Sequence, residues 1–131
     1  MVDVQLHLGD CLEFMRTLPD KSVDAVITDP PYGTIACEWD VAIPFLEMWD
    51  EIERIRKDKA AVVLFSKKPF TASLISSNIK NYKYDWIWEK PKASGYPSVK
   101  YRPLSAHEEI NVFYPHEFYI VTGKQIGRAH V

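Results

Sequence analysis

Residue types that build metal centres and disulfide frameworks are scarce in this chain. It holds 2 cysteines, Cys11 and Cys37, and 4 histidines in 131 residues. The cysteines form no CxxC pair, neither lies at ligand spacing from a histidine, and no HExxH motif occurs. This pattern excludes the common zinc motifs and a disulfide scaffold, so we expect two reduced thiols and no metal.

Long apolar runs and an excess of one charge are also missing. Asp3 and Gly9-Asp10 interrupt the early apolar stretch, and no segment approaches the roughly 20 apolar residues of a membrane span. We therefore expect no signal peptide, no membrane association and a cytoplasmic location. The formal net charge of -2 gives no overall attraction to nucleic acid, so binding of that kind depends on a local patch.

The most informative segment that is present is Asp29-Pro30-Pro31-Tyr32. It follows the short β-branched run 24–28, which indicates a buried strand. Prolines cannot donate to a strand ladder, so this strand should end at Asp29. The segment thus places a carboxylate, the Pro30 carbonyl and an aromatic ring at a strand's carboxyl end, where open α/β sheets bind ligands. The plain alternative is a turn, because prolines after an acid often form one.

A second feature is a basic region that also carries aromatic residues. Eight lysine and arginine residues between Lys67 and Arg102 alternate with Tyr82, Trp86, Tyr101 and other rings. Lysines alone are typical of a solvated face, whereas lysines with aromatics favour a groove that binds a nucleic-acid strand.

Periodicity along the chain predicts an α/β domain with strands and helices in alternation. We expect strands at 4–8, 24–28, 60–65, 84–89 and 109–114, helices at 11–18, 44–55 and 69–75, and a long loop at 90–106. The first three long strands should be parallel, and the last two strands should form an antiparallel pair. With 131 residues, one domain is the upper limit.

The Asp29–Tyr32 segment resembles the catalytic motif of DNA methyltransferases that modify adenine N6 or cytosine N4. The resemblance extends to Gly9-Asp10-Cys11-Leu12, to Val63-Leu64-Phe65-Ser66, and to the spaced pattern 86–90, Gly95, 103–104 and 107–110. It implies a partial Rossmann-like methyltransferase fold, with a mostly parallel sheet and an antiparallel terminal strand pair. Residues 1–119 would form the catalytic domain and 120–131 a tail of uncertain origin.

The resemblance also implies roles for individual residues. Catalysis would involve Asp29, Pro30, Pro31 and Tyr32. The cofactor S-adenosylmethionine would contact Asp10, Asp29, Phe65 and Ser66. The DNA substrate, double-stranded with a flipped target base, would contact Tyr32, Lys90, Tyr101, Arg102 and His107. The Gly-rich cofactor loop of the family is absent, since Gly123 and Gly127 stand isolated.

Several functions stay open at this point. Asp rather than Ser at the head of the motif favours adenine N6 over cytosine N4. A fragment that only binds DNA or protein is the second hypothesis, and a homodimer is a further option. A protein-glutamine methyltransferase is a third hypothesis, against which Asp29 argues because the related motif usually begins with Asn. Asp10 has a structural alternative as a helix N-cap.

Overall fold

One mixed sheet organises the part of the chain that the computed structural model describes, residues 2–33, 38 and 40–115. Its four strands run in the order β1-β2-β4-β3. The elements in chain order are α1 (Cys11–Thr17), β1 (Val23–Thr28), α2 (Phe45–Ile55), β2 (Arg56–Ser66), α3 (Phe70–Ser77), β3 (Tyr82–Ser94), the 3₁₀ turn η1 (Tyr96–Ser98) and β4 (Ser105–Phe113).

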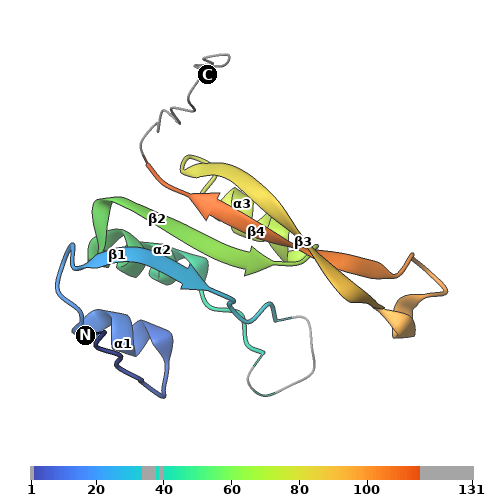
Figure 1. The fold of residues 1–131 in the computed structure, drawn as a ribbon, viewed down its shortest axis with the longest axis horizontal. Coiled ribbons are helices and arrows are strands. Elements are labelled where there is room, and N and C mark those ends of the chain that lie inside the picture. Colours follow the sequence, from blue (N-terminus) through green and yellow to red (C-terminus); the bar gives the residue numbers. More distant parts are fainter. Residues whose placement is uncertain (1, 34–37, 39, 116–131) are drawn as a thin grey trace, which may run out of the picture.

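The α/β fold class and the antiparallel terminal pair β3–β4 are confirmed (Figure 1). The parallel share of the sheet is smaller than expected, because only β1 and β2 pair in parallel among the described strands. The reason is that β4 inserts between β2 and β3, which makes its pairing with β2 antiparallel as well.

The expected strand at 4–8 is wrong. These residues form no strand, and Leu6 and Leu8 are 93% and 102% exposed. Alternation describes a strand's faces, but a strand also needs a neighbour to pair its backbone groups. The described sheet ends at β1 and pairs no strand with its outer edge.

The long loop expected at 90–106 is wrong at both of its ends. β3 continues through Pro91 to Ser94, and β4 already begins at Ser105, which pairs with Ser94. Proline is tolerated here because β3 is an edge strand, where a missing N–H costs no ladder bond. The connection is thereby reduced to residues 95–104, which include η1.

Helices α2 and α3 cover one face of the sheet. The covered residues alternate along β2, where Val62 and Leu64 are 1% and 0% exposed, and they pack with Ile52 and Leu74. The Trp49 indole N–H donates to the Ser77 hydroxyl at 2.7 Å, which ties the two helices together. None of the helices in the described ranges is long and apolar enough to cross a membrane.

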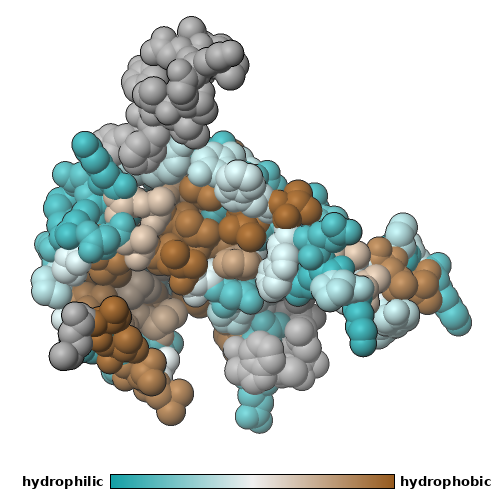
Figure 2. Space-filling view, in the orientation of Figure 1, coloured by the Kyte–Doolittle hydropathy of each residue, from teal (hydrophilic) through white to brown (hydrophobic). Residues whose placement is uncertain are grey.

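The opposite face of the sheet, called the open face below, is largely turned to solvent. Strand register places its residues in rows, since directly paired residues share a face. Ile27 and Trp86 on this face are 69% and 62% exposed, and Figure 2 shows an apolar area at its centre. The open face comprises Ile27, Val63, Val112 and Tyr84 in one row and Phe65, Ile110 and Trp86 in the next.

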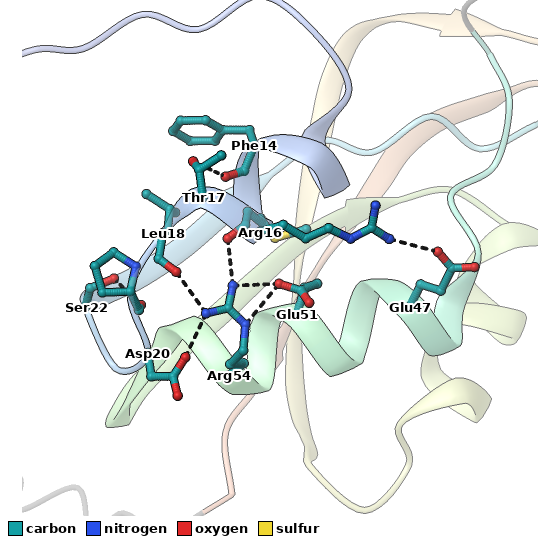
Figure 3. Close-up of polar contacts among 11 residues, drawn as sticks. Phe14, Arg16, Thr17, Leu18, Asp20, Ser22, Glu47, Glu51 and Arg54 are labelled. Carbon is teal, nitrogen blue, oxygen red and sulfur yellow. Dashed lines mark hydrogen bonds and ion pairs between the residues drawn. The ribbon is translucent and has the colours of Figure 1, made fainter.

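Arg54 holds α1 against α2 (Figure 3). Its guanidinium donates to the carbonyls of Met15 and Leu18, both at 2.8 Å, and pairs with Asp20 and Glu51. The last carbonyls of a helix have no partner within the helix, so Arg54 supplies donors that the end of α1 requires. This contact fixes the segment that leads into β1.

Candidate active site

Asp29 follows the last residue of β1 directly, at the carboxyl end of that strand. Because β2 runs parallel to β1, its last residue, Ser66, comes to the same edge of the sheet. The Asp29 carboxylate is exposed, whereas Pro30 is buried. The buried proline anchors the segment and leaves the acid accessible.

Tyr32 turns back on this carboxylate. Its hydroxyl donates to Asp29 Oδ1 at 2.9 Å, and its ring stacks on Phe70 with 5.0 Å between ring centroids and 22° between planes. Burial, and then the hydrogen bond to Asp29, raise the pKa of the Tyr32 phenol. The phenol is therefore a neutral donor that orients Asp29. The second oxygen, Oδ2, accepts no hydrogen bond from the described residues.

A hollow of about 280 Å³ lies beside Tyr32. Phe45 and Phe70, whose centroids are 5.7 Å apart, supply aromatic walls. The hollow is lined by Tyr32, Ala42, Phe45, Pro69, Phe70 and Ser73. Aromatic faces beside a free carboxylate suit a ligand that is planar or positively charged. Phe45 and Phe70 begin the two helices that the sequence predicted at 44–55 and 69–75, but no motif marked them as site residues.

Asp40 is a site residue that the sequence did not reveal. Its Oδ1 accepts from the Gly33 N–H at 3.0 Å, and the residue is 6% exposed. Gly33 has a φ of +69°, and a Cβ there would meet the Ala42 Cβ at 3.1 Å, so glycine suits this position in both respects. Asp40 thus fixes the chain immediately after Tyr32. Its partner is seven residues away in the sequence, so no periodic signal marks it.

Ser66 reaches the expected edge but is fully buried. Asn111 Nδ2 donates to its hydroxyl at 2.7 Å, and the Ser66 and Thr71 hydroxyls lie 2.7 Å apart. Thr71 donates to Glu109 Oε2 at 3.1 Å. A hydroxyl has one proton, so Ser66 must be the donor to Thr71. Each residue thus donates a hydrogen bond to the next, from Asn111 through Ser66 and Thr71 to the buried Glu109 carboxylate. These four residues are called the polar chain below.

The two other expected cofactor residues lie apart from the polar chain. Phe65 is half-buried on the open face, where its ring meets Trp88 edge-on at 5.7 Å. Asp10 caps α1, because its Oδ1 accepts from the N–H groups of Leu12 and Glu13 at 2.9 and 3.1 Å. The capping alternative for Asp10 is therefore confirmed, and its cofactor contact stays a prediction.

The structure brings together two of the expected substrate residues. Arg102 and His107 line one pocket of about 190 Å³ beside the end of β2. Lys90 instead pairs with Glu108 at 2.6 Å and stands 4.8 Å from the Trp88 ring centroid. Tyr101 is 89% exposed.

The chain is similar to known methyltransferases in sequence and in fold. No family model matches the chain. The type II methyltransferase M1.MboII of Moraxella bovis is 26% identical over 120 residues, which are 84% of this chain and 45% of that protein. The chain thus spans about half the length of this curated relative.

Solved structures share the fold at lower sequence identity. The M1.HpyAVI–SAM complex has a TM-score of 0.59 and 19% identity, over 83% of this chain and 55% of that one. The cytosine-N4-specific PvuII DNA methyltransferase has a TM-score of 0.65 and 18% identity, over 86% and 49%. TTHA0409 of Thermus thermophilus, complexed with S-adenosyl-L-methionine, has a TM-score of 0.59 and 20% identity, over 95% of this chain and 61% of that one. The chain is therefore similar in sequence to a type II methyltransferase, and it shares its fold with these solved methyltransferases.

Proposed function

We propose that the chain carries the catalytic segment of an S-adenosylmethionine-dependent DNA methyltransferase, and that its target is the N6 amino group of adenine. The observation that carries this proposal is the Asp29–Tyr32 geometry. One oxygen of an exposed carboxylate accepts from a neutral phenol, and the other, at the carboxyl end of a strand, accepts no hydrogen bond from the residues that the structure describes.

The chemistry demands such an arrangement. The exocyclic amine of a base is a poor nucleophile because its lone pair is delocalised into the ring. Asp29 Oδ2 and the Pro30 carbonyl are two acceptors for the two N–H groups of that amine, which favours a pyramidal nitrogen with a usable lone pair. As the new N–C bond forms, the nitrogen loses one proton, for which Asp29 is the nearest base of the motif.

The cofactor fits the residues that surround this carboxylate. S-adenosylmethionine, when bound, supplies a methyl group on a positively charged sulfur. The aromatic hollow formed by Tyr32, Phe45 and Phe70 is suited to a cation, and Asp29, which accepts a hydrogen bond from Tyr32, supplies a negative charge next to that lining residue. Asp10 and Phe65 would contribute further contacts. Ser66 would act from within the protein, since its hydroxyl is buried.

Tyr32 has two roles in this proposal. Its hydroxyl orients Asp29, and its ring offers a surface for a base taken out of the helix, where stacking contributes roughly 1–3 kcal/mol. Tyr32→Phe should therefore retain base binding and lose part of the rate, whereas Tyr32→Ala should lose both. Equal KM values for the two variants would contradict the stacking role.

The test requires a complete enzyme, because the chain spans 45% of its curated relative. The chain alone should incorporate no methyl group, since an incomplete pocket does not hold reacting atoms within about 3–3.5 Å of each other. In a chimera, the unmatched part of M1.MboII completes this chain. We expect transfer of labelled methyl groups to DNA, and Asp29→Ala should lower the rate ~10²–10³-fold while the melting temperature is unchanged.

Chromatography of the digested product identifies the base. N6-methyladenine is the expected product, and N4-methylcytosine would overturn the adenine assignment alone. Transfer that survives Asp29→Ala would overturn the catalytic role. A chimera that folds and binds S-adenosylmethionine but transfers no methyl group would overturn the proposed function and favour a module that only binds DNA or protein.

A further inference from the structure

The pocket next to the end of β2 is positively charged, in contrast to the chain as a whole. Lys67 and Lys68 come from the turn after β2, and Ser94 is the last residue of β3. Arg102 lies in the β3–β4 connection, and His107 and Glu109 belong to β4. Three positive side chains face one carboxylate there, which leaves two positive charges with His107 neutral. The whole chain has a formal net charge of -2. A polyanion would therefore be attracted to this pocket and not to the molecule in general.

The cations are held in position by the pocket itself. Lys67 Nζ donates to the Ser94 hydroxyl at 2.5 Å, a neutral partner that leaves its charge uncompensated. Lys68 Nζ lies 3.2 Å from Glu109 Oε1, and Glu109 is itself fixed by Thr71 from the protein interior. Arg102 makes no ion pair or hydrogen bond through its side chain with the described residues. Two anchored amines thus face one guanidinium whose donors are unused.

This combination matches the chemistry of a phosphate group. Guanidinium donors form a fork that binds two phosphate oxygens at once, and lysine amines add point charges. Ser94 and Ser105 add hydroxyl groups to the lining. A volume of about 190 Å³ is small for a nucleoside but admits a phosphate group.

The pocket is also placed correctly relative to the candidate active site. Lys68 directly precedes Pro69 and Phe70, which line the hollow beside Tyr32. Glu108 and Glu109 contribute to the raised pKa of Tyr32, so the two sites are close enough to interact electrostatically. A nucleotide whose base stacks on Tyr32 would carry its phosphate toward Lys68.

We infer that Lys67, Lys68 and Arg102 form a pocket for a phosphodiester of the DNA strand that carries the target nucleotide. The inference rests on the proposed function, since it takes DNA as the substrate. Lys67 and Lys68 thereby become substrate-binding residues in addition to Arg102. Each contact of this type adds to affinity through counterion release and is weakened by salt.

The test is the salt dependence of DNA binding by the purified chain. Fluorescence anisotropy of a labelled duplex between about 50 and 200 mM KCl gives the slope of log affinity against log salt. Arg102→Gln and Lys67→Gln should each reduce the slope by about 0.9, which is about a threefold smaller loss of affinity over this range. Lys59→Gln, exposed near the start of β2 and outside the pocket lining, is the matched control and should leave the slope unchanged.

Each outcome decides one question. Equal slopes for the pocket variants and the control, or no DNA binding at all, would overturn the pocket. Saturable binding of inorganic phosphate that DNA fails to displace would reassign it to a free anion. If methyl transfer by the chimera depends on Asp29 while the slopes are unchanged, only the pocket fails. If the slopes change and no methyl transfer occurs, the pocket stands and the proposed function fails.

Discussion

Thr71 is the residue at which the buried polar chain can be interrupted with the smallest change of shape. It is 3% exposed, and its hydroxyl accepts from Ser66 and donates to Glu109. Thr71→Val replaces that hydroxyl with a methyl group of similar size. The variant therefore tests the hydrogen bonds rather than the packing.

The expected loss of stability follows from what each neighbour is left with. Glu109 loses a hydrogen bond to a charged group, worth about 1.5–3 kcal/mol, and the fully buried Ser66 hydroxyl loses its acceptor, which costs about 1–3 kcal/mol. Relaxation recovers part of this sum, so we expect Thr71→Val to lower the free energy of unfolding by about 3 kcal/mol. In a domain of this size the melting temperature would fall by about 10 °C.

Urea and thermal unfolding, followed by circular dichroism and tryptophan fluorescence, measure this loss. Thr71→Ser retains the hydroxyl and should cost about 1 kcal/mol for the lost methyl group. Thr28→Val, at an exposed position, should change stability by less than about 0.5 kcal/mol. If Thr71→Ser were as damaging as Thr71→Val, packing and not the directed chain of donors would explain the result.

The remaining predictions concern the cap, the core and the phenol. Asp10→Ala should lower the free energy of unfolding in urea by about 1 kcal/mol, and Asp10→Asn by much less, because Asn also caps helices. Equal losses for the two variants would rule out a capping role of Asp10. Leu64→Ala should cost about 3–5 kcal/mol in urea unfolding, since Leu64 is 0% exposed; a loss under 1 kcal/mol would contradict its core position. Because the pKa of Tyr32 is raised in the folded state, its contribution to stability is present at neutral pH and is lost as pH rises above about 10, the pKa of an unfolded tyrosine. The difference in unfolding free energy between wild type and Tyr32→Phe should therefore shrink above this pH. A difference that stays constant with pH would refute the raised pKa.

The sequence was informative wherever the determining interaction is local. The prolines, which cannot donate to a strand ladder, predicted the end of β1 to within one residue. The helical spacing of apolar residues predicted α1, α2 and α3 to within a few residues of their observed bounds. The rule that prolines break strands then failed at Pro91, because edge and central strands differ only in whether a neighbour requires the N–H. The strand predicted from the alternation at 4–8 is also wrong, because alternation shows which residues share a face and not whether a partner strand is present.

Site residues were missed where their partners are distant along the chain. Thr71 and Glu109 are 38 positions apart, and Asn111 and Ser66 are 45 apart. Neither pair follows a helical or strand period, so only the folded sheet brings them together. Asp40 was missed for a related reason, because a carboxylate that accepts from one backbone N–H leaves no trace in hydrophobic patterning.

The sheet order has a consequence for the route by which the site forms. β3 and β4 are joined by residues 95–104, the shortest connection between two paired strands of the described sheet. β1 reaches β2 only after the longer crossover through α2. We expect β4 to gain protection first and β1 last in pulse-labelling hydrogen exchange, and early protection of β1 would contradict this order. Because Asp29 lies at the end of β1, the catalytic segment would be assembled in the final step of folding, on a scaffold that is already in place.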